Sequence, residues 1–287
     1  MNPFVLGVDI GGTHITAATV DMESRTLLPQ AQVREHIDAG ASPEEITTAW
    51  AGAMKAAMEK CTERVGKIGI AMPGPFDYTN GIALMQGQGK YDALYGVDVI
   101  AMVADKLGLS KSDIRTLNDA ACFLQGEVFG GAAKGYSRAI GVTLGTGLGT
   151  ARFKDGLAED ADLWDTPFGE SIAEEYLSSR WFVKRYNELT GKQVPHVKAM
   201  VDRLPQEPVV EEIFREFGEN LATFLVPFIR EAEPEVLVLG GNISKAYVLF
   251  ESALRQGLEQ QHCLIPVKTA ILGEEAALLG AASLWVE

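Results

Sequence analysis

One pattern of residues occurs twice in this chain and limits the folds that it can adopt. Residues 7–13 read GVDIGGT and residues 141–147 read GVTLGTG, each between two runs of β-branched and apolar residues. Both segments therefore predict two strands joined by a glycine-rich turn. The likeness of two such short segments can arise by chance. If it reflects two similar halves, the two turns face each other across a cleft, where ligands most often bind.

The rest of the chain predicts an alternation of strands and helices. Ser42, Pro43 and Glu45 give one helix a clear start, with a capping residue, a proline at the first position and a capping-box glutamate. Alternation of this kind predicts an α/β fold with a largely buried sheet in each half, and 287 residues are enough for two domains of about 150. Strands are expected at 4–8, 15–20, 67–72, 114–117, 138–144, 148–153, 235–239 and 266–272, and helices after residue 42, at 97–107, 120–129 and 274–285, and through most of 172–232.

Charge and cysteine content exclude several classes of function. The chain has 25 basic and 39 acidic residues, a net charge of −14, and no basic patch, so we expect neither nucleic acid nor a membrane as a partner. The longest apolar run, 276–286, is far shorter than the ~20 residues of a membrane span. The first residues of the chain show no secretory signal. The three cysteines are far apart and form no Cys-x-x-Cys pair, so we expect a cytoplasmic protein without disulfides or a zinc site.

The two glycine turns are candidate phosphate sites, because glycine lets the backbone approach a phosphate and point several N–H groups at it. The chain contains no Walker loop, and Gly149 leads into a strand where a dinucleotide fingerprint would need a helix. Two hairpins that hold a polyphosphate from opposite sides fit this context better. Asp9 ends the first strand, where a carboxylate can hold Mg²⁺ directly or through water. The alternative is that each turn is an ordinary hairpin.

Asn118 and Asp119 lie at the junction of a predicted strand and a predicted helix. An asparagine side chain offers donors and an acceptor to sugar hydroxyls, and a carboxylate in this place can accept the proton of an attacking hydroxyl. The alternative is that one of the two residues only caps the helix that begins at Ala120.

Six segments, taken in order, resemble the ROK family of bacterial sugar kinases, within the actin, hexokinase and Hsp70 superfamily. They are residues 6–13 and 144–149 (two phosphate motifs), 71–77 (the loop beside the sugar), 117–121 (the catalytic segment), 236–242 (the adenosine motif) and 272–282 (the closing helix). The resemblance implies a two-domain actin-like ATPase fold, which is ribonuclease H-like, with a central cleft. It divides the chain into an N-terminal domain of residues 1–117, joined by the helix at 274–287, and a larger domain of residues 118–273.

The resemblance also implies a reaction. The chain would transfer phosphate from ATP, with Mg²⁺, to a hydroxyl of glucose or a related aldohexose or N-acetylhexosamine, with Asp119 as the general base. A homodimer is expected by analogy. The sugar site would contain Gly74, Asn118 and Asp119. The ATP site would contain Asp9, Gly11, Gly12, Thr13, Gly145, Thr146, Gly147, Gly240, Gly241 and Asn242. Independently of the resemblance, the position of Asn242 after a predicted strand suggests that it caps the following helix.

Departures from the family pattern leave the substrate open. The family's zinc segment and its Glu-x-Gly-His motif are absent, and its lysine after the first phosphate motif is His14 here. Residues 173–179 resemble the family's Leu-Glu-x-Tyr-x-Ser-Gly stretch, which makes Glu174 a candidate sugar ligand, the alternative being a solvated acid on an amphipathic helix. Without zinc, we expect buried packing of Trp164, Pro167 and Phe168 to brace this region.

Gln86, Gln88 and Lys90 occupy a loop where relatives often offer asparagine to the sugar.

The alternative function is a non-catalytic protein of the same fold that binds nucleotide or sugar, or a regulator. Regulators of this family carry a DNA-binding domain before the first phosphate motif, and only eight residues precede Asp9 here.

Overall fold

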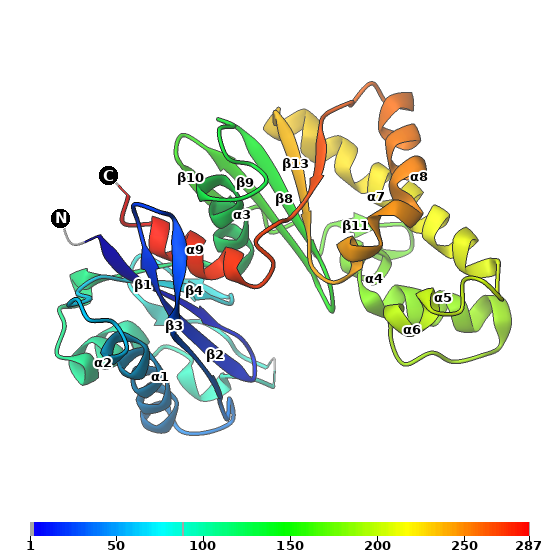
Figure 1. Ribbon diagram of the computed structural model, residues 1–287. Helices are drawn as coiled ribbons and strands as arrows, with labels where there is room; N and C mark the ends of the chain where they lie inside the picture. Colours follow the sequence, from blue (N-terminus) through cyan, green and yellow to red (C-terminus); the bar gives the residue numbers. More distant parts are fainter. Residues whose placement is uncertain (1–2, 88, 287) are drawn as a thin grey trace. The chain divides into compact units, whose positions relative to one another are not determined.

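The computed structural model describes residues 3–87 and 89–286, and its internal contacts divide the chain into two units (Figure 1). The first unit contains the residues up to Lys134, the short segment Leu157–Glu159 and the residues from Glu274 onward. The second unit contains Gly135–Gly156 and Asp160–Gly273. Gln88, named above with the sugar loop, lies outside the described residues.

The first unit is built on a five-stranded sheet of order β3-β2-β1-β4-β7. Strand β1 pairs antiparallel with β2 and parallel with β4, which in turn pairs parallel with β7. The edge strand β3 was not predicted, and an edge is the position in a sheet that tolerates the proline it contains, Pro29. The strands are β1 (Phe4–Ile10), β2 (His14–Asp21), β3 (Thr26–His36), β4 (Ile68–Met72) and β7 (Ile114–Asn118), with a separate small hairpin of β5 (Phe76–Asp77) and β6 (Ile82–Ala83).

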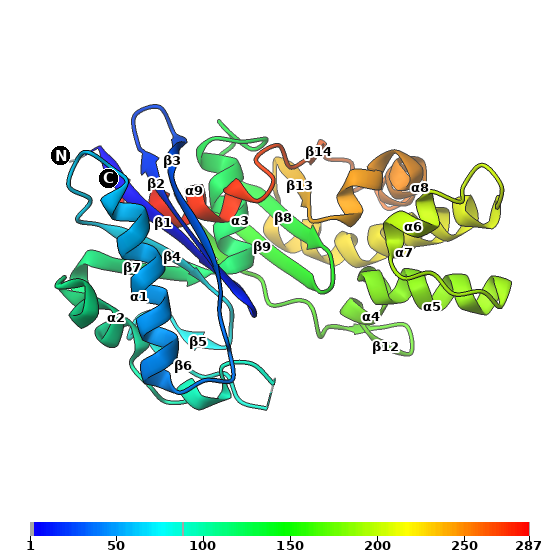
Figure 2. The ribbon, with the colours of Figure 1, turned by 60° about the horizontal axis from the view of Figure 1, so that its bottom comes forward.

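Helices cover both faces of this sheet. Helix α1 (Pro43–Glu59) begins at the predicted capping box, in which Ser42 and Glu45 bond each other's backbone, and it packs with α2 (Val99–Leu107) over the apolar side chains of the strands. Helices α3 (Asp119–Phe129) and α9 (Glu275–Ser283) pack on the opposite face (Figure 2). Two short 3₁₀ turns, η1 (Asp92–Leu94) and η2 (Lys111–Asp113), lie beside α2 in the chain.

Close packing of α3 against α9 places the domain boundary later than predicted. A Cβ added to Gly280 of α9 would overlap the carbonyl oxygen of Cys122 in α3, so the two helix backbones are in direct contact. Helix α3 therefore belongs to the first unit, which extends to Lys134, whereas the sequence placed the boundary after Leu117.

The second unit repeats the arrangement of the first. Its sheet has the order β10-β9-β8-β13-β14, in which β8 pairs antiparallel with β9 and parallel with β13, and β13 pairs parallel with β14. The edge strand β10 belongs to this sheet by its hydrogen bonds, although its residues Leu157–Glu159 are grouped with the first unit. Both sheets thus carry a hairpin followed by two parallel strands in the same order, which supports the internal repeat. The strands are β8 (Ala139–Leu144), β9 (Leu148–Lys154), β10 (Leu157–Asp160), β13 (Val236–Gly240) and β14 (Val267–Thr269).

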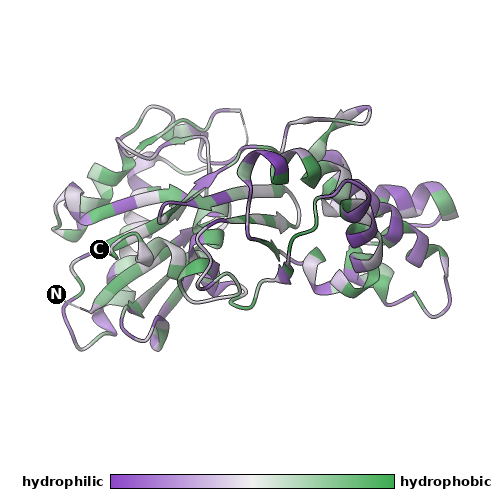
Figure 3. Ribbon diagram, turned by 90° about the horizontal axis from the view of Figure 1, so that it is seen from above, coloured by the Kyte–Doolittle hydropathy of each residue, from purple (hydrophilic) through white to green (hydrophobic). Residues whose placement is uncertain are grey.

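Aromatic side chains form the core of the helical part of the second unit. Phe182, Phe214, Phe217 and Phe250 are fully buried and contact one another. Green and purple segments alternate along these helices in Figure 3, as expected for helices with one buried face. They are α4 (Ala173–Leu177), α5 (Ser179–Thr190), α6 (Val197–Val201), α7 (Val209–Ala232) and α8 (Tyr247–Gln260), together with the 3₁₀ turn η3 (Ile243–Ala246) and a hairpin of β11 (Pro167–Phe168) and β12 (Ser171–Ile172).

Candidate active site

Three parallel strands of the first unit bring predicted site residues to one edge of the sheet. Asp9 of β1 pairs with Ala71 of β4, and Met72 at the end of β4 pairs with Asn118 at the end of β7. The carboxyl ends of parallel strands are the usual place for a binding site in an α/β sheet. Asp9, the loop at Gly74 and the Asn118–Asp119 pair therefore share this edge.

Asn118 caps helix α3, as one of the two sequence interpretations predicted. Its side-chain oxygen accepts hydrogen bonds from the backbone N–H groups of Ala120, at 2.8 Å, and Ala121, at 3.2 Å. Its amide nitrogen donates to the hydroxyl of Tyr78 at 3.3 Å, beside Gly74. These bonds fix the orientation of the side chain and leave the next residue, Asp119, on the first turn of the helix.

Asp9, which is half-buried, and Asp119, which is exposed on the first turn of α3, are carboxylates that influence each other. Burial, with a smaller contribution from the charge of Asp119, raises the pKa of Asp9 to about 6, while the charge of Arg34 opposes the rise. Desolvation also raises the pKa of Asp119, although the Ala120 N–H and the charge of Lys90 lower it. A carboxyl group with a raised pKa is a stronger base once it is ionised, which suits proton transfer near neutral pH.

The first glycine turn, residues 11–13, is held from three sides. Within the turn, the N–H of Gly11 donates to the carbonyl of His14 at 2.8 Å. The carbonyl of Thr13 accepts from Ile37 at 2.8 Å, and the carbonyl of Gly11 accepts from the hydroxyl of Tyr91 at 2.7 Å. The backbone of the turn is therefore fixed without any ligand.

The second glycine turn, residues 145–147, is anchored by the segment that joins α4 to α5. The N–H of Ser179 donates to the carbonyl of Gly145 at 2.8 Å, and the N–H of Leu148 donates to Oε2 of Glu174 at 3.1 Å. The other oxygen of Glu174 accepts from Arg180 at 2.7 Å. A Cβ added to Gly147 would lie 2.7 Å from Oε2 of Glu174, so any larger residue there would displace this carboxylate. Glu174 thus supports this turn, and its role as a sugar ligand stays a prediction.

The predicted adenosine motif, Gly240–Asn242, lies at the same sheet edge as the second turn. Gly240 ends β13, where it pairs with Thr143 of β8. Gly241 has a φ of 81°, and a Cβ there would overlap the backbone of Leu144, so the fold itself requires glycine at this position. The capping role expected of Asn242 was wrong: its helical φ and ψ leave its side chain without a cap hydrogen bond, and its oxygen accepts from Lys245 instead.

Bracing of the Glu174 region also differs from the expectation. The side chain of Trp164 is 44% exposed, so it does not contribute buried packing. Its carbonyl instead accepts the N–H of Glu174 at 2.9 Å, and the ring of Phe168 contacts the ring of Tyr176 edge-on at 5.2 Å. The backbone and Phe168 hold this region.

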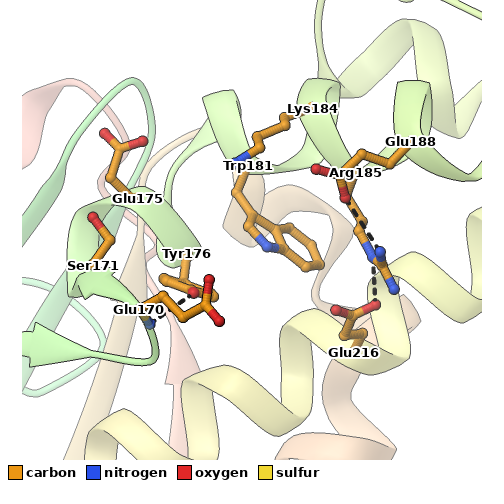
Figure 4. Close-up of a pocket in the computed structure, with 9 residues that line it drawn as sticks. All are labelled: Glu170, Ser171, Glu175, Tyr176, Trp181, Lys184, Arg185, Glu188 and Glu216. Atoms are coloured by element: carbon orange, nitrogen blue, oxygen red, sulfur yellow. Dashed lines mark hydrogen bonds and ion pairs between the residues drawn. The ribbon is translucent and has the colours of Figure 1, made fainter.

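A separate polar cavity of about 420 Å³ lies between α4, α5 and α7 (Figure 4). Its lining contains none of the predicted site residues; it includes Tyr176 and Trp181, and an ion pair between Arg185 and Glu216 crosses part of it at 2.8 Å. Within residues 3–87 and 89–286, no three His, Cys, Asp or Glu side chains come together as a metal site. No helix of the same residues is long and apolar enough to cross a membrane.

The two repeated units and their glycine turns define the fold as that of the actin-like ATPases, which confirms the predicted fold class. The chain belongs to the ROK family, whose family model matches residues 5–158 and 170–287. It is 24% identical to an N-acetyl-D-glucosamine kinase of Mannheimia succiniciproducens and 26% identical to an N-acetylgalactosamine kinase of a Shewanella species. The matches cover 98% of both chains in the first comparison, and 97% of this chain and 95% of its relative in the second.

A solved structure shows the same fold. The ROK family glucokinase of Streptomyces griseus, in complex with glucose and AMPPNP, superimposes with a TM-score of 0.76 at 23% identity, over 98% of each chain. The segment 159–169 is the one internal stretch that the family model leaves unmatched, and it contains Trp164.

Proposed function

We propose that this protein phosphorylates a hexose with ATP. The observation that carries the proposal is the placement of Asp119, an accessible carboxyl group whose pKa is raised by desolvation, beside Asn118 and Gly74 at the edge that also holds the first glycine turn. Membership of the ROK family and the kinase relatives support the same reaction. Because those relatives act on N-acetylhexosamines, we propose an N-acetylhexosamine or glucose as the sugar.

In the proposed mechanism, Asp119 accepts the proton of the attacking sugar hydroxyl. The hydroxyl oxygen forms a bond to the γ-phosphorus as the bond from that phosphorus to ADP breaks. Phosphoryl transfer has a loose transition state, so positioning and charge balance matter more than base strength. Asn118 offers its amide N–H to the sugar beside Gly74, and its capping bonds hold it in place.

We assign ATP to the glycine-rich segments. The proposed ligands are the turn residues Gly11, Gly12 and Thr13, the turn residues Gly145, Thr146 and Gly147, and Gly240, Gly241 and Asn242. Asp9 fits a Mg²⁺ ion, since it is a half-buried carboxylate close enough to Asp119 to feel its charge, and Mg²⁺ usually takes one or two carboxylates, phosphate oxygens and waters. When bound, the ion would neutralise phosphate charge.

The test is a coupled assay of ADP release. Purified protein is supplied with Mg²⁺-ATP and, in separate reactions, with glucose, mannose, N-acetylglucosamine, N-acetylgalactosamine and N-acetylmannosamine. We expect sugar-dependent ADP release with at least one of them, and its loss in Asp119→Asn. ATP binding by calorimetry without turnover of any sugar would favour the non-catalytic alternative.

A further inference from the structure

The loop after β6 brings a lysine to the first glycine turn. Tyr91, the residue after Lys90, is fully buried, and its hydroxyl donates to the carbonyl of Gly11 at 2.7 Å. Its N–H donates to the carbonyl of Ala39 at 2.8 Å, and its ring contacts Trp50 edge-on at 5.4 Å. These contacts fix the backbone at residue 91, so the fold sets the position of Lys90 beside the turn.

The side chain of Lys90 lies along this turn. Its Cδ is 3.3 Å from the point where a Cβ at Gly12 would stand, so the glycine leaves the room that the lysine occupies. The positive charge of Lys90 lowers the pKa of Asp119, against the effect of desolvation. The ammonium group is therefore close enough to act on both the turn and the carboxylate.

The other cationic groups near this edge already have partners. Arg34, which acts on Asp9, forms an ion pair with Glu274 at 3.0 Å. The ring of His14 bonds the hydroxyl of Thr13 at 2.8 Å and contacts the ring of His36 edge-on. Lys90, by contrast, forms no hydrogen bond or ion pair with any residue in the described part of the chain. Its half-buried side chain keeps a free charge at the edge where phosphate is proposed to bind.

We infer that Lys90 binds the terminal phosphate of ATP and balances the charge that develops on the phosphoryl group during transfer. An ammonium group on a flexible stem is suited to this, because it acts as a point charge and can follow a moving phosphoryl group. A charge placed where the transition state becomes more negative lowers the barrier more than it strengthens ground-state binding. The inference rests on the function proposed above.

The experiment compares Lys90→Met, which keeps the length of the side chain, with Lys134→Met as the control. Lys134 is exposed in the same unit and has no side-chain partner among the described residues. Calorimetry with Mg²⁺ measures the affinity for AMPPNP and for ADP. We expect Lys90→Met to weaken AMPPNP binding about tenfold and ADP binding much less, as for the loss of one charge-assisted contact. We also expect kcat to fall roughly 10²-fold, with little change in the KM of the sugar.

Lys90→Arg should keep most of the AMPPNP affinity, because the charge remains. The inference is overturned if Lys90→Met binds AMPPNP and ADP as the unaltered protein does, or if it weakens both equally. Failure of the inference about Lys90 can be told apart from failure of the proposed function. If the unaltered protein phosphorylates none of the sugars, the proposed function fails, and the contrast between AMPPNP and ADP still decides the role of Lys90.

Discussion

At the scale of single residues, the carboxylates Asp9 and Asp119 stand out because the fold gains nothing from desolvating them. A charge that loses contact with water costs free energy unless it is paired, and here desolvation raises the pKa of both groups. Arg34 and Lys90 compensate only in part. Groups held in a costly state at a sheet edge are characteristic of sites where a ligand supplies the missing charge.

Asp119→Asn tests the general base. The amide keeps the size of the side chain and an oxygen that can accept the Ala120 N–H, but it cannot accept a proton from the sugar. We expect kcat to fall about 10²-fold or more, while calorimetry shows ATP binding close to that of the unaltered protein. Turnover near the original rate would assign residue 119 a purely structural role.

Asp9→Asn tests whether the raised pKa of Asp9 makes the stability of the folded protein depend on pH. The pKa of Asp9 is about 6 in the folded protein, against about 4 in an unfolded chain. The folded state therefore holds the proton more tightly, and this adds stability below about pH 4 that is lost as the pH rises through 6.

Asparagine resembles the protonated form, so Asp9→Asn should be more stable than the unaltered protein above pH 6, by about 2–3 kcal/mol, and close to it near pH 4. Thermal unfolding in EDTA without nucleotide measures the difference, with the exposed Asp105→Asn as control. A difference that does not change with pH would contradict the prediction.

Residues at this edge differ in how far the sequence could predict them. The motifs identified Asp9, Asn118 and Asp119 as candidates, and the position of Asn118 before Ala120 already suggested a cap. The contact of Tyr91 with Gly11 joins residues 80 positions apart, and no local pattern predicts it. The sequence assigned Lys90 to a loop beside the sugar, which stays a prediction, and its proximity to Gly12 and its effect on Asp119 follow only from the folded chain.

At the scale of elements, the second glycine turn depends on helices α4 and α5 more than on its own strands. Glu174 joins the turn to Arg180 through its two oxygens, at 3.1 Å from the Leu148 N–H and 2.7 Å from the guanidinium. Its side chain is 21% exposed, so its bonds are partly shielded from water. Movement of α4 would therefore move the turn.

Glu174→Ala should loosen this turn, because Leu148 loses its acceptor. We expect the KM for ATP to rise more than the KM for the sugar, by about tenfold or more, as for the loss of one hydrogen bond to a charged group. Glu175→Ala is the matched control, since Glu175 also contacts Arg180 but has no bond to the turn. A rise confined to the KM of the sugar would instead support the sugar-binding role predicted from the sequence.

The sequence predicted most helices and strands. It predicted the role of a side chain wrongly where the same residue type can act in more than one way. Strand and helix periodicity located both hairpins and the capping box at Ser42. Trp164 was expected to be buried because it is large and apolar, yet its backbone carbonyl does the bracing. Asn242 occupies a position typical of a cap, but its helical backbone angles prevent the bond.

At the scale of the whole molecule, the first unit is assembled from distant parts of the chain. Helix α9 packs on α3, β1 and β4 through glycines, and Gly280 lies against the carbonyl of Cys122. Contacts of this kind involve backbone atoms that cannot move aside one at a time. For this reason the sequence could predict that the closing helix joins the first domain but not that α3 does.

Gly280→Ala should destabilise the protein by about 1–3 kcal/mol or more, because a single methyl group would separate two packed helices. Gly52→Ala in α1 is the control: a Cβ there meets nothing within 4 Å, and alanine favours a helix, so its stability should stay equal or rise. Chemical denaturation measures both variants. Equal stability of the two would mean that α3 and α9 separate more easily than their packing implies.

The late position of α9 has a consequence for how the protein is made. A ribosome releases β1 and β4 long before it releases residues 274–286, and the whole second unit is synthesised in between. During that interval the sheet face that α9 will cover is open to water and to other nascent chains. Transient exposure of this kind makes a chain prone to aggregation. We therefore expect the nascent polypeptide to be most prone to aggregation while its last helix is still inside the ribosome.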